Sequence, residues 1–80
     1  MLTESAIKSA FGSVLRELRD QQKISQEALA LQSGLDRSYV SQIERGLRQP
    51  TIVTLFKLAR TLKTRPSDLV RLLEETAGSR

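Results

Sequence analysis

The sequence predicts a compact all-α fold of five helices. Apolar residues recur at spacings of three and four, and no alternating, strand-like run is present. Residue types that begin and end helices stand between these segments. The chain has 80 residues, of which 39% are hydrophobic, 4% aromatic and 28% charged, which is the composition of a globular protein with one core. We therefore expect a single domain over residues 1–80, with a core at about 6–76 and a frayed tail at 77–80.

The first helix is expected over roughly residues 5–22. Its apolar residues fall in one arc at 100° per residue, as in a helix that buries one face. They are Ile7, Ala10, Phe11, Val14, Leu15 and Leu18.

Two short helices follow, at residues 26–33 and from 37 to about 45. Ser25 is a candidate N-cap for the first of them, and Gly34 ends it in a left-handed conformation. Asp36 can cap the second, and Gly46 ends it.

The last two helices begin at Thr51 and Pro66. Thr51 is a candidate N-cap, and Pro66 suits a first helical position, from which a fifth helix runs to about Thr76. The fourth helix places its apolar residues on one side, where we expect the core. They are Ile52, Leu55, Phe56, Leu58, Ala59 and Leu62.

Composition removes several classes of function. Cysteine and histidine are both absent, which excludes disulfides and the commonest metal ligands. The serines have no histidine base, and neither paired carboxylates nor a phosphate-binding glycine loop appears. We therefore expect neither an enzyme nor a bound metal or cofactor. No apolar run is long enough to span a bilayer or to form a signal peptide, so we expect a cytoplasmic location without membrane contact.

The positive charge is concentrated in the middle of the chain. Thirteen Lys and Arg residues against nine Asp and Glu give a net charge of +4. Residues 1–35 sum to zero, residues 36–65 to +5, and residues 66–80 to −1. A central basic stretch is expected of a protein that binds a polyanion. A solvated face that only maintains solubility is the alternative.

The two short helices have the spacing of a helix-turn-helix. They are joined by a short turn that contains Gly34, and Ala30 is small where the helices would cross. Apolar contacts between them come from Leu29, Leu35, Val40 and Ile43. A helix pair of this kind can also be purely structural.

The run GLDRSYVSQIERG, residues 34–46, resembles the phage-repressor-like (lambda repressor-like) helix-turn-helix family, and most of all its restriction-modification controller proteins. The resemblance spans roughly residues 8–73. It implies a transcriptional regulator that binds a palindromic double-stranded DNA operator as a homodimer. Ser33 departs from the family, which often has a small apolar residue there, and we expect its hydroxyl to bond back to its own helix.

One face of the third helix is polar. At 100° per residue, Arg37, Ser38, Ser41, Gln42 and Arg45 fall within about 140° of each other. The opposite side carries Tyr39, Val40, Ile43 and Leu47, which we expect in the core. The polar face therefore points toward a partner.

Arg37 is the most informative residue of this face, because a cation in a first turn opposes the helix dipole. Bidentate bonding to guanine would explain its position, whereas a solvated arginine held by Asp36 or Glu27 is the alternative. Gln42 could read adenine through its amide. Two serines could contact a base or a phosphate, namely Ser38 and Ser41.

Candidate phosphate contacts surround this face. Gln26 lies at the N-terminus of the second helix, where the dipole favours anions, and the resemblance implies the same role. Arg45, Arg48 and Thr51 follow the third helix and suit backbone anchoring, or are ordinary surface residues. Tyr39 is either a core aromatic or a further phosphate contact.

Two further predictions concern an ion pair and a dimer interface. The resemblance implies that Arg19 and Glu44 form a buried ion pair. The fifth helix has more apolar surface than a small core needs, which predicts a dimer interface. The residues expected there are Leu69, Val70 and Leu73.

The expected partners are therefore double-stranded DNA and a second copy of the chain. Glu27 stands next to the DNA-facing surface and is a candidate contact for RNA polymerase. The alternative is an antitoxin-type or other protein-interaction module whose DNA binding is secondary.

Overall fold

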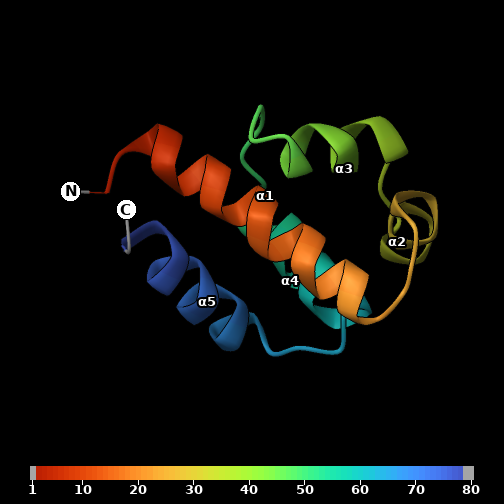
Figure 1. Cartoon of the computed structure of the whole chain (residues 1–80). Coiled ribbons are helices and arrows are strands. Elements are labelled where there is room, and N and C mark those ends of the chain that lie inside the picture. Colours follow the sequence, from red (N-terminus) through yellow and green to blue (C-terminus); the bar gives the residue numbers. More distant parts are fainter. Residues whose placement is uncertain (1, 79–80) are drawn as a thin grey trace.

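The structure is a computed structural model and describes residues 2–78, which form five helices and no strand. The helices are α1 (Glu4–Gln21), α2 (Gln26–Ser33), α3 (Arg37–Glu44), α4 (Ile52–Thr61) and α5 (Pro66–Gly78) (Figure 1). The predicted all-α class is confirmed, and the predicted starts and ends hold to within two residues.

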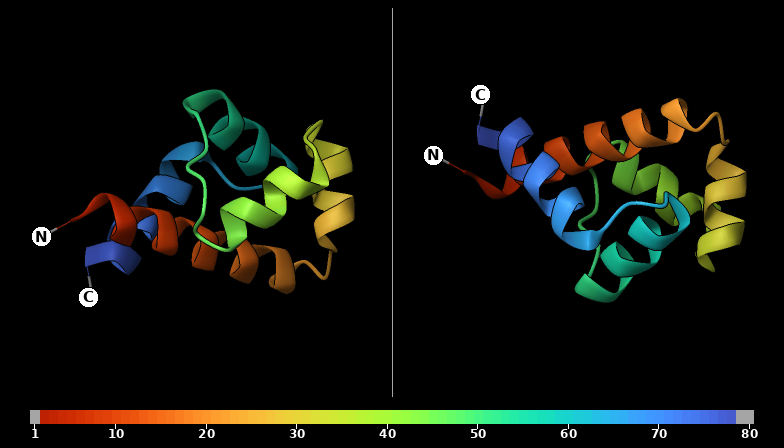
Figure 2. Two further views of the ribbon diagram at one scale, coloured as in Figure 1. Left: turned by 90° about the horizontal axis from the view of Figure 1, so that it is seen from above. Right: turned by 90° about the horizontal axis from the view of Figure 1, so that it is seen from below.

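The long helix α1 is the centre of the arrangement. It packs against α5 on one side and α3 on the other, while α2 contacts α3 and α4, and α4 contacts α5. In both views of Figure 2, α2 stands at the opposite end of the molecule from the start of α1 and the end of α5. No helix within residues 2–78 is long and apolar enough to cross a membrane.

Three of the five helices begin at a side-chain cap. Hydroxyl oxygens of Thr3, Ser25 and Thr51 accept hydrogen bonds from backbone N–H groups three residues later, at 3.0–3.1 Å. Asp36 occupies the N-cap position of α3, but its side chain makes no capping bond within the described part of the chain. Our expectation of a capping carboxylate there is wrong, because this side chain is exposed and water can satisfy it.

Four helices end in the same way. Gly34 and Gly46 have φ values of 71° and 74°, as predicted, but Lys23 and Lys63 adopt the same left-handed conformation at 57° and 55°. In each case the next N–H donates to a carbonyl five residues earlier, which closes a Schellman-type turn. The two lysine turns were not predicted, because a side chain disfavours positive φ.

The core is built from side chains of all five helices. Its fully buried large side chains are Leu15, Leu29, Val40, Ile43, Leu58, Leu62 and Leu69.

Three predicted core residues lie outside this core. Ile52 is 71% exposed and Phe56 is 55% exposed, because α2 and α5 cover a narrower strip of α4 than its apolar arc. Leu47 is 59% exposed, because it follows the end of α3 and is turned out by Gly46.

The predicted frayed tail needs a correction at its start. Ala77 is helical and buried, because α5 continues beside α1 for two residues beyond its predicted end. Residues 79 and 80 of that tail lie outside the described residues.

Candidate nucleic-acid interface

Helices α2 and α3 pack on each other through a shared buried strip. Leu29 and Ala30 of α2 and Val40 and Ile43 of α3 are all buried, and Leu35 in the turn packs against them. The turn is only three residues long because Gly34 reverses the chain in the left-handed conformation. The pair is thereby held as one unit, with the other side of α3 outward.

The outer face of α3 consists of Arg37, Ser38, Ser41 and Gln42. Arg37 and Ser38 are exposed, whereas Ser41 and Gln42 are half-buried at its edge. Arg45 is exposed just beyond the helix. The four side chains come together on the side away from the buried residues, as the helical period predicts.

Arg37 contacts α2 only weakly. Its Nη1 lies 3.8 Å from Oε2 of Glu27, and both side chains are mostly exposed. This is one of the contacts that we considered as an alternative to DNA binding. An exposed pair of this kind contributes about 0–1 kcal/mol, so it leaves the guanidinium available to a ligand.

Arg48 folds back onto α3 instead of extending away from it. Its guanidinium carbon lies 5.1 Å from the centre of the Tyr39 ring, and its Nη1 lies 3.5 Å from Oε1 of Gln42. Tyr39 is half-buried and packs against the core. These three side chains, with Asp36 and Ser38, line a shallow hollow beside α3.

Two of the expected phosphate contacts are engaged within the protein. The side-chain Nε2 of Gln26 donates to Glu44 Oε1 at 2.9 Å, and its backbone N–H lies in the first turn of α2. The Thr51 hydroxyl accepts from Thr54 N–H and donates to the Thr54 hydroxyl, which makes it part of the α4 cap.

Arg19 and Glu44 form the ion pair that the family resemblance implied. Arg19 Nε and Nη2 donate to the two oxygens of Glu44 at 2.8 and 3.1 Å, and the side chains are 15% and 3% exposed. A further bond, from Arg19 Nη1 to the Ile24 carbonyl at 2.9 Å, fixes the loop before α2. The hydrogen bond to Glu44 raises the pKa of Arg19 above its usual value. Together with Gln26, this pair ties α1, α2 and α3 into one frame.

Gly12 is a supporting residue that sequence reasoning missed. A Cβ at this position would lie 2.5 Å from the backbone oxygen of Glu44 and 2.7 Å from that of Ile43. The glycine therefore allows the backbone end of α3 to rest directly on α1. A glycine in the middle of an amphipathic helix was the available signal, because it is otherwise unfavourable there.

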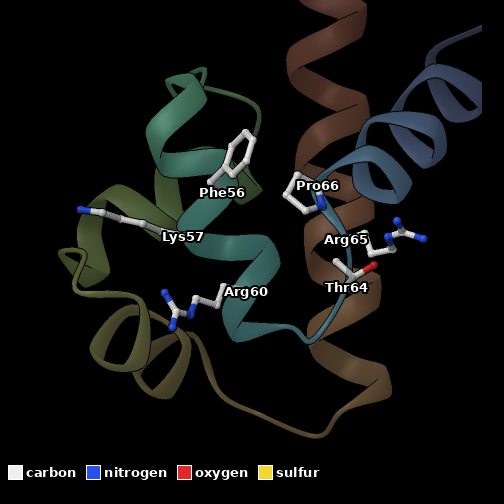
Figure 3. Close-up of a pocket in the computed structure, with 6 residues that line it drawn as sticks. All are labelled: Phe56, Lys57, Arg60, Thr64, Arg65 and Pro66. Atoms are coloured by element: carbon white, nitrogen blue, oxygen red, sulfur yellow. The ribbon is translucent and has the colours of Figure 1, made fainter.

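A second exposed surface is apolar and lies on α4 and α5. Figure 3 shows the rings of Phe56 and Pro66 facing each other across a hollow, while the Lys57 side chain points away. Ile52, Val53 and Phe56 are exposed on α4, and Val70 is exposed one turn beyond Pro66 on α5. We call Ile52, Val53, Phe56 and Val70 the apolar surface.

The predicted dimer interface is only partly available. Leu69 is 1% exposed and belongs to the core, so its assignment to an interface is wrong; its side of α5 faces the other helices. Leu73 is half-buried and packs against the core. Val70 alone of the three predicted residues is exposed.

Ser33 connects α2 to α4. Its hydroxyl donates to Oγ1 of Thr61 at 2.9 Å, and Thr61 in turn donates to the Lys57 carbonyl at 3.1 Å. The expected bond to its own helix is replaced, because Ser33 is buried against α4 and finds an acceptor there.

Comparison with known proteins agrees with this arrangement. The sequence profile of the helix-turn-helix family matches residues 15–69. The chain is 40% identical over 70 residues to control protein C.MunI from Mycoplasma sp., covering 86% of this chain and 95% of that protein.

Solved structures agree as well. The restriction-modification controller protein C.AhdI from Aeromonas hydrophila is 50% identical, with a TM-score of 0.75 over 78% of this chain and 94% of its own. The controller C.Esp1396I, solved as a tetramer with its natural 35-base-pair operator, is 31% identical, with a TM-score of 0.80 over 89% and 93%. The chain belongs to the helix-turn-helix family of DNA-binding transcriptional regulators.

Proposed function

We propose that this protein is a restriction-modification controller that binds a palindromic, double-stranded DNA operator as a homodimer. The observation that carries the proposal is the outer face of α3, which holds four polar side chains outside the core on a helix fixed by its other face. A helix presented in this way fits the major groove, with the residues of its first turns at the base edges. The likeness to C.MunI and C.AhdI supports the controller class.

Base reading is assigned to the outer face of α3. Arg37 is exposed in the first turn and can bond the O6 and N7 atoms of a guanine bidentately. Ser38 and Ser41 can contact neighbouring base edges or phosphates.

Phosphate contacts are assigned to groups around that face. Exposed Arg45 supplies charge beyond the end of α3, and the backbone N–H of Gln26 supplies a donor at the positive end of α2. The Tyr39 hydroxyl is a third candidate. Glu27, exposed on α2 beside Arg37, is the proposed contact for RNA polymerase.

The homodimer is assigned to the apolar surface. Four exposed apolar side chains on adjacent helices are typical of a surface that is covered by a partner. A two-fold dimer through this surface should place two copies of α3 about 34 Å apart, which is one turn of DNA.

Selection of bound sequences from a random DNA pool tests the function directly. We expect enrichment of a palindrome with two half-sites about one turn apart. Enrichment of no sequence would overturn the proposal and favour a protein-interaction module.

Two arginine variants then separate base reading from anchoring. Arg37→Ala should lose about 1–3 kcal/mol on the selected site and flatten the preference at one base pair. Arg45→Ala, the matched loss of one charge, should weaken selected and random duplexes alike and lower the salt slope by about one. If Arg37→Ala weakens both duplexes equally, Arg37 is a backbone contact and its assignment fails.

A further inference from the structure

The contact between Arg48 and Gln42 has a chemical consequence for base recognition. An arginine side chain carries only donors, so the atom of Gln42 that faces it is the acceptor Oε1, at 3.5 Å from Nη1. The amide is planar, and its Nε2 is therefore directed away from the guanidinium. Nε2 has no acceptor among residues 2–78 and is free to donate to a ligand.

The Tyr39 ring holds this arrangement in place. The guanidinium lies over the ring at 5.1 Å, a distance at which the cation–π attraction is appreciable. Tyr39 itself packs against the core, and Gln42 is half-buried one turn further along α3. Arg48 is thereby positioned by Tyr39 and orients Gln42.

We propose that Arg48 and Gln42 read a guanine together, as one donor surface. This inference rests on the proposed DNA binding and names the base that this part of the site selects. With Oε1 turned toward Arg48, the pair presents N–H groups, which match the two acceptors O6 and N7 of guanine. The exocyclic amino groups of adenine and cytosine would meet a donor instead of an acceptor. Arg48 is then a positioning residue for specificity in addition to a source of charge, and Gln42 reads guanine instead of the adenine that its residue type alone suggests.

Three variants in one set of binding measurements test the proposal: Gln42→Ala, Arg48→Ala and the double variant. Selection of bound DNA sequences with Gln42→Ala identifies the base pair that Gln42 reads, because the variant loses its base preference at that position. Duplexes with guanine or adenine at that position are then titrated with each protein. For the parent we expect guanine to bind more tightly than adenine by about fivefold or more.

Arg48→Ala should reverse or abolish this preference, because the freed amide can accept from adenine N6 and donate to N7 at the same time. In the Gln42→Ala background, the same loss of Arg48 should change the ratio of the two affinities less than it does in the parent, because no amide remains that could turn toward adenine. Arg45→Ala serves as the control for the lost charge and should leave the guanine preference intact.

If Arg48→Ala weakens the guanine and adenine duplexes by equal factors, Arg48 is only a phosphate contact and the inference is wrong. A parent preference for adenine at this pair, or a Gln42→Ala variant that flattens no position, would also overturn it. These outcomes leave operator binding itself in place, whereas enrichment of no sequence by the parent overturns the proposed function and this inference together.

Discussion

The outer face of α3 and the apolar surface on α4 and α5 are both exposed, but they differ in the support beneath them. The α3 face stands on a frame of defined polar contacts, in which Glu44 accepts from Arg19 and Gln26 and the α3 backbone rests on Gly12. The apolar surface consists of side chains that are left over after the core is filled, such as Ile52 and Phe56. A rigid polar face suits a ligand of fixed shape, and uncovered apolar side chains suit a second protein surface.

The largest expected effect comes from breaking the frame under α3. Arg19→Met should lower the free energy of unfolding by about 3–5 kcal/mol, because it leaves the buried Glu44 carboxylate without its partner. Urea unfolding of both proteins measures the loss.

The double variant Arg19→Met/Glu44→Gln is the control for this experiment. It removes both charges and should recover part of the lost stability. If Arg19→Met unfolds at the same urea concentration as the parent, the pair does not support the frame.

Removing the apolar surface should break self-association without unfolding the chain. Phe56→Glu places a charge within that surface and should weaken dimerisation by about 2 kcal/mol or more. Sedimentation equilibrium over micromolar concentrations measures the effect.

Leu31→Glu is the matched control, because Leu31 is 81% exposed on α2, a helix that carries none of the four residues of the apolar surface. It introduces the same charge and should sediment like the parent. Equal behaviour of the two glutamate variants would contradict the assignment of the interface to α4 and α5.

The close approach of α1 and α3 can be tested with a single methyl group. At an exposed position inside a helix, replacing glycine by alanine stabilises the helix by about 1 kcal/mol. Gly12→Ala should instead destabilise the protein by about 1–3 kcal/mol, because its Cβ meets the α3 backbone. Thermal unfolding gives the sign. A stabilised Gly12→Ala protein would show that α3 does not rest on α1 in this way.

The smallest expected effect concerns the hydrogen bond that joins α2 to α4, outside the frame under α3. Ser33→Ala removes the hydroxyl that donates from α2 to Thr61 of α4, and should cost about 0.5–1.5 kcal/mol in unfolding free energy. Binding to the selected operator should stay within about twofold, because the frame under α3 does not include this bond. A large loss of DNA affinity with unchanged stability would contradict that separation.

The sequence alone was sufficient to predict the positions of the helices and the outer face of α3. The spacing of apolar residues and the cap residues identify helices because both depend on a few neighbouring residues, and α2 begins and ends where Ser25 and Gly34 predict. The outer face was predictable for the same reason, since a short helix with one buried side must expose the other.

The tertiary structure decided which apolar residues are buried and which polar residues are already engaged. Helical spacing places Phe56 beside Leu55 and Val70 beside Leu69, but only the covering helices determine that one of each pair is exposed. In the same way, Gln26 turns to Glu44 and Arg48 to Gln42 because the fold brings together residues distant along the chain or beyond the helix end. Local sequence preferences fix the direction of a side chain from its own helix, and the packing of the helices fixes what that side chain meets.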